Sequence, residues 1–158
     1  MPVWSNVMVP PAPPVVRLAA VMAESPESLF QKLADAALHL CRAGSAGISL
    51  RERSDSDVFR WVAVAGAYTR YRGNTLPRYF SPCGTVLDRN MCLLMADPIR
   101  SFPYIEELDA PVREVLLVPF YQDSEPVGTV WVVAHDTKTH FDAEDSRIIT
   151  SLTKFAGA

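Results

Sequence analysis

The sequence has no surplus of positive charge and no long hydrophobic run. Its 158 residues include 15 lysines and arginines against 18 acidic residues, for a formal net charge of -3. Binding to phosphate backbones requires a basic surface, so nucleic acid is not an expected partner. The longest apolar stretches, residues 15–23 and 127–134, are far shorter than the ~20 residues that span a bilayer. We therefore expect no membrane partner for this chain.

Cysteine and histidine are scarce. The cysteines are Cys41, Cys83 and Cys92, with no Cys-x-x-Cys spacing, and the three histidines show no His-x-x-x-His spacing. Zinc and iron sites depend on such spacings, so no metal site is predicted. The odd number of cysteines, with no signal peptide before them, favours a reducing, cytoplasmic location.

Catalytic signatures are also missing. The chain contains no P-loop, no Gly-x-Ser-x-Gly and no Gly-x-Gly-x-x-Gly motif. Asp136 and His140 flank a loop, but no nucleophile accompanies them. The sequence therefore predicts no catalytic residue, and it names no cofactor.

The composition is that of a folded domain, with 49% hydrophobic and 21% charged residues. Residues 1–24 contain four prolines between positions 10 and 14 and are predicted to be a tail or linker with a short apolar segment. Residues 25–158 are predicted to form a single domain with its own core.

A helix is predicted at each end of this domain. Ser25 and Pro26 supply an N-cap and a first helical position, and apolar residues then recur at helical spacing until Gly44. Near the end of the chain, Asp142 and Asp145 occupy the N-cap and N3 positions of the closing helix.

Two pairs of strands are predicted between the helices, at residues 47–53 and 59–65, and at 115–121 and 127–135. The short connection within the second pair requires antiparallel pairing. Pro119 cannot donate a ladder hydrogen bond and so predicts an edge or a bulge.

The segment between the two strand pairs, residues 66–112, is punctuated by glycine and proline. A long irregular insertion within a compact domain is more often a binding loop than a linker. We therefore expect this segment to contribute to a binding site.

This order of elements is α+β with an antiparallel sheet covered on both faces, and it resembles the GAF domain. Three stretches carry the resemblance: VLLVPF at residues 115–120, PVGTVWV at 126–132 and FDAED at 141–145. FSPCGTVLDR at 80–89 and CRAGSAGISL at 41–50 resemble the GAF subgroup of bacterial two-component sensor histidine kinases.

The resemblance implies a sheet of five or six strands. It places the N- and C-terminal helices on one face and the irregular insertion over a ligand pocket on the other. Known ligands across the family include cyclic nucleotides, bilins, haem and small metabolites, so the fold does not name the ligand. The resemblance further implies a regulatory input module, with a histidine kinase output domain outside this chain.

Ten residues are candidates for the pocket. They are Phe80, Ser81, Cys83, Gly84, Thr85, Phe102, Tyr104, Arg113, Trp131 and His135. Pro82 predicts a short helix that starts near Cys83 and directs its first amides at a cavity of about 300 Å³. Arg113 would bind an anionic or carbonyl-bearing ligand, and Trp131 or Tyr104 would stack on it.

Two alternative functions remain open. Cys83, close to a helix start, could be a reactive thiolate of a redox sensor, or a buried packing residue. The chain could instead be a dimerisation module without a ligand. Ile148, Leu152 and Phe155 have the spacing of a coiled-coil seam, which predicts a homodimer through the terminal helices; burial against the sheet of the same chain is the alternative.

Overall fold

The computed structural model describes residues 26–52 and 57–156, the last two without their side chains. The predicted tail over residues 1–24 and most of the turn over 54–57 lie outside the described residues. The main elements are α2 (Pro26–Leu40), β1 (Ser45–Glu52), β2 (Val58–Gly66), β3 (Thr75–Pro77), α3 (Pro82–Arg89), β4 (Leu93–Ala96), β5 (Glu114–Gln122), β6 (Glu125–Ala134) and α4 (Ala143–Ala156). Three short 3-10 helices, η1 (Thr69–Tyr71), η2 (Pro98–Arg100) and η3 (Pro103–Glu107), complete the insertion.

The strands form one six-stranded sheet in the order β3-β2-β1-β6-β5-β4. Every neighbouring pair is antiparallel. The predicted α+β class and sheet size are therefore confirmed, as is the antiparallel pairing of β5 with β6, in which Val118 lies opposite Val130.

Pro119 lies where β5 has become an edge. The neighbouring β4 pairs with β5 only from Glu114 to Leu117, so no strand in the described part of the chain pairs with the outer side of β5 at Pro119. The pairing with β6 also shifts register between Phe120 and Tyr121. Both an edge and a bulge are thus present where the proline predicted one of them.

The two outermost strands come from the insertion, which the sequence predicted to be irregular. β3 pairs with β2, and β4 pairs with β5. β3 has only three residues, and the four residues of β4 are all apolar, so neither sequence shows the alternation of apolar and polar residues by which a half-buried strand is recognised.

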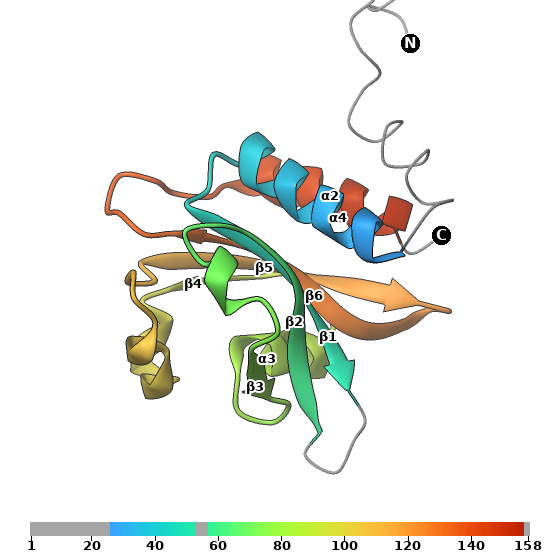
Figure 1. Cartoon of the computed structure of the whole chain (residues 1–158), viewed down its shortest axis with the longest axis horizontal. Helices are drawn as coiled ribbons and strands as arrows, with labels where there is room; N and C mark the ends of the chain where they lie inside the picture. The colour runs from blue at the N-terminus through green and yellow to red at the C-terminus, as the bar shows by residue number, and fades with distance from the viewer. Residues whose placement is uncertain (1–25, 53–56, 157–158) are drawn as a thin grey trace, which may run out of the picture.

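Helices α2 and α4 lie side by side over one face of the sheet (Figure 1). Val130 and Val132 of β6 point to this face and are buried with Leu33 of α2 and with Ile149 and Leu152 of α4. Leu152 is only 2% exposed, so it packs in the core of its own chain and is not available for the predicted coiled-coil seam. The side chain of Phe155 lies outside the described residues.

The start of α4 follows the sequence prediction. Asp142 Oδ1 accepts the amide of Asp145 at 3.0 Å, and Asp145 Oδ2 accepts the amide of Asp142 at 2.9 Å. The two carboxylates thereby satisfy amides that have no partner within the helix. No helix among the described residues is long and apolar enough to cross a membrane.

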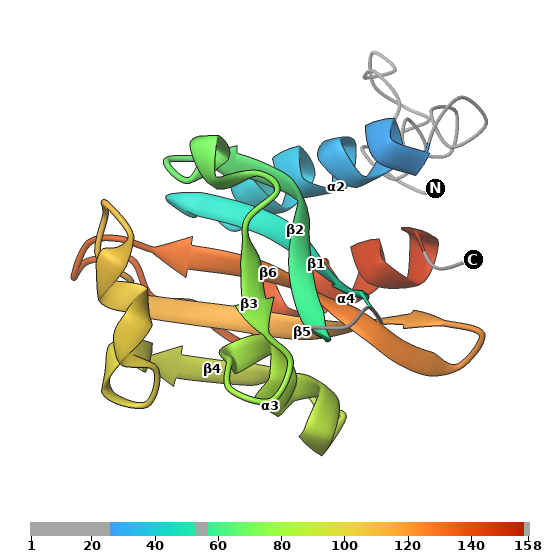
Figure 2. The same ribbon diagram turned by 60° about the horizontal axis from the view of Figure 1, so that its bottom comes forward.

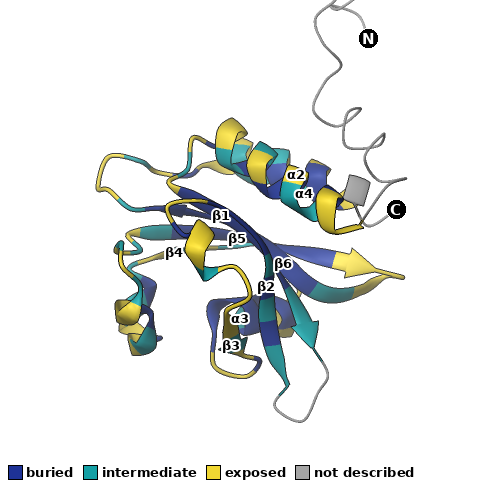
Figure 3. Cartoon of the chain, in the orientation of Figure 1, coloured by how far each residue is buried: buried dark blue, intermediate teal, exposed yellow. Residues whose placement is uncertain are grey.

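The opposite face of the sheet has its own apolar core, beneath α3 and the rest of the insertion (Figure 2). The alternate residues of β6, Trp131 and Val133, point to this side and pack with Trp61 and Cys83. Both faces of the central strands are consequently buried (Figure 3). The prediction that helices cover one face and the insertion covers the other is confirmed.

Candidate functional site

Helix α3 begins where the sequence predicted a short helix. Ser81 is the N-cap, with extended backbone, and its Oγ accepts the amide of Gly84 at 3.1 Å. Its carbonyl accepts the amide of Thr85, and Pro82 has no amide hydrogen. Most first-turn donors are therefore already satisfied inside the helix, which leaves few amides for a ligand.

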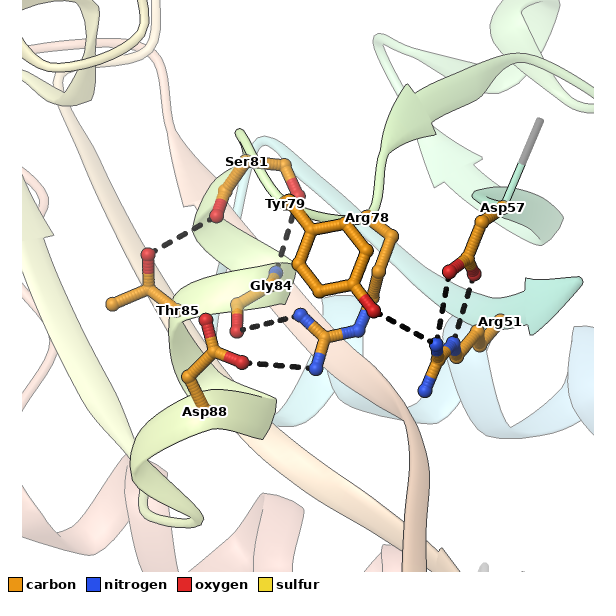
Figure 4. Close-up of polar contacts among 8 residues, drawn as sticks. All are labelled: Arg51, Asp57, Arg78, Tyr79, Ser81, Gly84, Thr85 and Asp88. Atoms are coloured by element: carbon orange, nitrogen blue, oxygen red, sulfur yellow. Dashed lines mark hydrogen bonds and ion pairs between the residues drawn. The ribbon is translucent and has the colours of Figure 1, made fainter. Parts of the chain in front are cut away.

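Arg78 fixes the loop before α3 to the helix itself (Figure 4). Its guanidinium donates to the carbonyl of Gly84 at 3.4 Å and to Asp88 Oδ1 at 2.9 Å. A Cβ on Gly84 would lie 2.1 Å from the carbonyl oxygen of Arg78, so only glycine permits this approach. These contacts set the position of Pro82 and Cys83 over the sheet.

The polar contacts extend from this loop to the end of β1, where Arg51 and Asp57 lie (Figure 4). Arg51 of β1 donates two hydrogen bonds of 2.9 Å to the carboxylate of Asp57 and a third, of 3.3 Å, to Tyr79 Oη. The amide of Arg78 donates to the carbonyl of Asp57 at 3.2 Å. The start of β2 and the loop before α3 are thereby connected.

An aromatic cluster connects η3 to the start of α3. The rings of Phe80 and Phe102 lie 5.3 Å apart, and those of Phe80 and Tyr104 lie 5.8 Å apart. Tyr104 Oη donates to the carbonyl of Phe80 at 2.7 Å. The two parts of the insertion that face the sheet are thus packed together.

The loop at residues 108–112 is attached to the sheet by Tyr68 and His135. Tyr68 Oη donates a hydrogen bond to the carbonyl of Ala110. His135 Nδ1 lies 2.9 Å from the carbonyl of Pro111, and its Nε2 lies 2.8 Å from Ser45 Oγ. Since a carbonyl can only accept, Nδ1 of the neutral ring carries the hydrogen and Nε2 accepts the Ser45 hydroxyl.

A cavity of about 180 Å³ lies between the sheet, α3 and η3. It is smaller than the roughly 300 Å³ at the lower limit of pockets for drug-sized ligands. Its walls are mostly apolar, and its exposed residues are Asn74, Thr75 and Glu107. The lining residues are Trp61, Tyr68, Asn74, Thr75, Leu76, Pro82, Cys83, Pro98, Tyr104, Ile105, Glu107, Leu108, Val112, Val115, Leu117, Trp131 and Val133.

Three of the ten candidate residues, Cys83, Tyr104 and Trp131, line this cavity. Five others build the structure around it without lining it: Phe80, Ser81, Gly84, Thr85 and Phe102.

The remaining two candidates, Arg113 and His135, lie outside the cavity lining. Arg113 is exposed, and its amide donates to the carbonyl of Ala134. The side chain of His135 attaches the loop at residues 108–112 to the sheet. No arginine within residues 26–52 and 57–156 lines the cavity, where we expected Arg113 to bind an anionic or carbonyl-bearing ligand.

Cys83 is buried, and its Sγ lies 3.2 Å from Thr129 Oγ1. Burial raises the pKa of this thiol, which keeps it protonated at neutral pH. All three cysteines are free thiols, and none of the described residues forms a cluster that could hold a metal ion.

Three residues that line the cavity, Trp61, Tyr68 and Glu107, are not among the ten candidates, although the sequence places Trp61 and Tyr68 in a set of aromatic residues around the insertion that suits a pocket. Trp61 lies two positions after Phe59 and therefore on the same buried face of β2, so the strand pattern of the sequence indicates its orientation. Glu107 follows from no sequence pattern, because its place beside the cavity depends on how η3 folds back over the sheet.

Solved structures with the same fold support this architecture. The GAF domain of an Acinetobacter phosphoenolpyruvate-protein phosphotransferase matches with a TM-score of 0.74 at 13% identity, covering 91% of this chain and 88% of that one. The second GAF domain of DevS from Mycobacterium smegmatis matches with a TM-score of 0.66 at 19% identity, covering 84% and 91%. Free methionine-R-sulfoxide reductase from Neisseria meningitidis, solved with its substrate, matches with a TM-score of 0.66 at 16% identity, covering 90% and 83%.

At these identities the structures show a shared fold and nothing about a shared ligand. No curated protein matches the chain significantly. A family model described as the GAF domain matches residues 23–158. With this match over most of its length and the same sheet and helix arrangement, the chain belongs to the GAF domain family.

Proposed function

We propose that residues 25–158 form a ligand-sensing regulatory domain, the cytoplasmic input module of a two-component sensor histidine kinase. The kinase output domain would lie outside this chain. The observation that carries the sensing role is the cavity between the sheet and the insertion. The resemblance of residues 80–89 and 41–50 to the histidine-kinase subgroup supports the choice of output.

The arrangement of β6 offers a route from ligand to output. Trp131 and Val133 line the cavity from one face of β6, while Val130 and Val132 pack beneath the helices on its other face. Suppose that β6 has two conformations, each with its own placement of α4. A ligand that binds one of them more tightly would increase the population of that conformation and of its α4 placement. In the parent protein, α4 would pass the change on towards the output domain.

A thermal-shift screen of small metabolites, nucleotides and tetrapyrroles tests the sensing role. A ligand that binds only the folded state at 100 times its Kd stabilises it by about 2.7 kcal/mol, so the melting temperature should rise. Leu108→Trp adds bulk to the cavity lining and should abolish the shift. Leu94→Trp, at an exposed position on β4 away from the lining, is the matched control and should preserve it.

If no compound changes the melting temperature of the wild-type chain, the sensing role is contradicted and a dimerisation module is the better account. The redox alternative has less support, because the Cys83 thiol is buried and its pKa is raised. A homodimer through the terminal helices remains part of the proposal, but it would have to use surfaces other than Leu152.

A further inference from the structure

Four aromatic rings surround the cavity. Trp61 and Trp131 lie 4.9 Å apart with their planes at 51°, and Tyr68 stacks on Trp61 at 6.3 Å. Tyr104 adds a ring from η3, on the insertion side. The faces of such rings carry negative electrostatic potential and attract organic cations, most strongly where water is excluded.

The charge of the cavity lining has one sign. Among the described residues that line the cavity, Glu107 is the only one with an ordinarily charged side chain, and none is an arginine, lysine or histidine. Burial raises the pKa values of the hydroxyls of Tyr68 and Tyr104, so both remain neutral at physiological pH. An anion would find no opposite charge here, whereas a cation would find a carboxylate.

Two arginines of the insertion have carboxylate partners away from the cavity. Arg78 pairs with Asp88 at 2.9 Å, and Arg70 pairs closely with Asp109. The charges of the described lining residues therefore do not support the predicted preference for an anionic ligand, and the carboxylate of Glu107 favours a cation. The buried indole Nε1 of Trp61 has no hydrogen-bond partner and is free to donate to an oxygen of the ligand.

We propose that this cavity binds a small organic cation, an alkylated ammonium group, with the aromatic rings around the cation and Glu107 at the open side. The inference rests on the proposed sensing function and specifies its ligand class. The volume of about 180 Å³ limits the ligand to a compact molecule.

A pair of nearly isosteric probes isolates the charge. Choline carries a trimethylammonium group, and 3,3-dimethyl-1-butanol has a neutral tert-butyl group in its place. We expect choline, added to the full chain, to raise the melting temperature and change the tryptophan fluorescence, since Trp61 and Trp131 line the cavity. The neutral alcohol at equal concentration should have little effect.

Glu107→Gln removes the charge and preserves the shape of the side chain. Because Glu107 is exposed, the variant should fold as the wild type does, and its affinity for choline, measured by calorimetry, should fall about two- to fivefold. Glu106→Gln is the matched control, because Glu106 is also exposed on η3 but does not line the cavity. Its affinity for choline should equal that of the wild type.

The contribution of the rings is tested by Tyr104→Leu, which should weaken choline binding by about 2- to 30-fold. Tyr121→Leu, on β5 outside the cavity lining, should not weaken it. A circular dichroism spectrum and melting curve of each variant will show that it is folded before its affinity is measured.

The results separate this inference from the proposed function. If neutral or anionic compounds bind, Leu108→Trp blocks them, and choline does not bind, the preference for a cation is wrong while the sensing function stands. Equal binding of choline and its neutral analogue also overturns the inference. If no compound of any charge binds, both proposals fail.

Discussion

The sulfur of Cys83 lies in the cavity wall, yet its surroundings suppress its reactivity. The side chain is buried, and the raised pKa of the thiol leaves almost no thiolate at neutral pH. Burial, helped by the nearby carboxylates of Asp145 and Asp142, also raises the pKa of Cys41, to about 12. Cys92 is only partly buried.

This difference predicts the order of alkylation. Iodoacetamide at neutral pH should modify Cys92 first, and Cys83 and Cys41 only slowly. Mass spectrometry of tryptic peptides over time would measure the three rates, with Cys92→Ser as the control for the first product. Modification of Cys83 in the native protein as fast as that of a free thiol would instead support the redox sensor.

Burial also predicts which apolar side chains the fold requires. Leu33 is fully buried in α2, so Leu33→Asp would place an unpaired charge in the core and should unfold the domain or destabilise it by several kcal/mol. Trp131→Ala should cost about 3–5 kcal/mol, because it leaves a large cavity.

Chemical denaturation would measure both losses in stability. Leu40→Asp in the same helix is the control for Leu33→Asp, since Leu40 is 39% exposed, and it should change stability by no more than about 0.5 kcal/mol. A wild-type midpoint for Leu33→Asp or Trp131→Ala would contradict the observed core.

At the scale of elements, the position of α3 depends on Arg78. This side chain is 9% exposed and donates to Gly84 and Asp88 of the helix. Arg78→Met would remove both hydrogen bonds while keeping much of the apolar side chain. We expect a loss of about 1–3 kcal/mol in the free energy of unfolding, together with weaker binding at the cavity.

Arg89→Met is the matched control for this change, because Arg89 lies in the same helix but is exposed. Urea denaturation should place it within about 0.5 kcal/mol of the wild type. Equal effects of the two substitutions would show that Arg78 does not position the helix.

A contact between β5 and the loop that precedes α4 depends on pH. His140 Nδ1 lies 3.1 Å from Glu114 Oε2, while Glu114 Oε1 accepts the amide of Phe141 at 2.6 Å. The hydrogen bond and charge of Glu114 raise the pKa of His140 above its ordinary value of 6.5. The pKa of His140 is higher in the folded state than in the unfolded state, so its contact with Glu114 stabilises the folded state below pH 6.5. This stabilisation is lost as the pH rises through the raised pKa.

NMR titration of the His140 ring should therefore give a pKa above 6.5 in the wild type. Glu114→Gln keeps an acceptor for the amide of Phe141 but removes the charge, so the pKa of His140 should fall towards its ordinary value. An unchanged pKa in this variant would rule out Glu114 as the cause. His140 is well exposed, so we expect only a small effect on the melting temperature.

For the whole molecule, the burial of Leu152 and Ile149 bears on self-association. Because Leu152 is buried within its own chain, the predicted coiled-coil seam of Ile148, Leu152 and Phe155 would require the domain to open. Ile148 lies at the partly buried margin of this core, and Ile148→Asp places a charge on the outer surface of α4. Sedimentation velocity at micromolar concentrations should give the same dimer population for this variant as for the wild type if α4 is not part of an interface. A dimer that Ile148→Asp dissociates without unfolding the chain would support the interface through the terminal helices.

The central elements could be predicted because each has a local periodicity. α2 and α4 show apolar residues at helical spacing with suitable N-terminal residues, and the two central hairpins have apolar strands joined by short connections. β3 and β4 could not be predicted, because short edge strands have several exposed residues and form only when a neighbouring strand pairs with them.

The sequence by itself determined the fold class, the two-sided burial of β6 and the start of α3 at Pro82, since each follows from the order of neighbouring residues. Only the tertiary structure decided which side chains meet at the cavity. Trp61 comes from β2, whereas Tyr104 and Glu107 come from η3, more than 40 positions later in the chain. Arg113, which the sequence placed beside a ligand, lies outside the lining. Long-range contacts such as those of Arg78 and His135 set how the insertion folds back over the sheet, and no local pattern specifies that geometry.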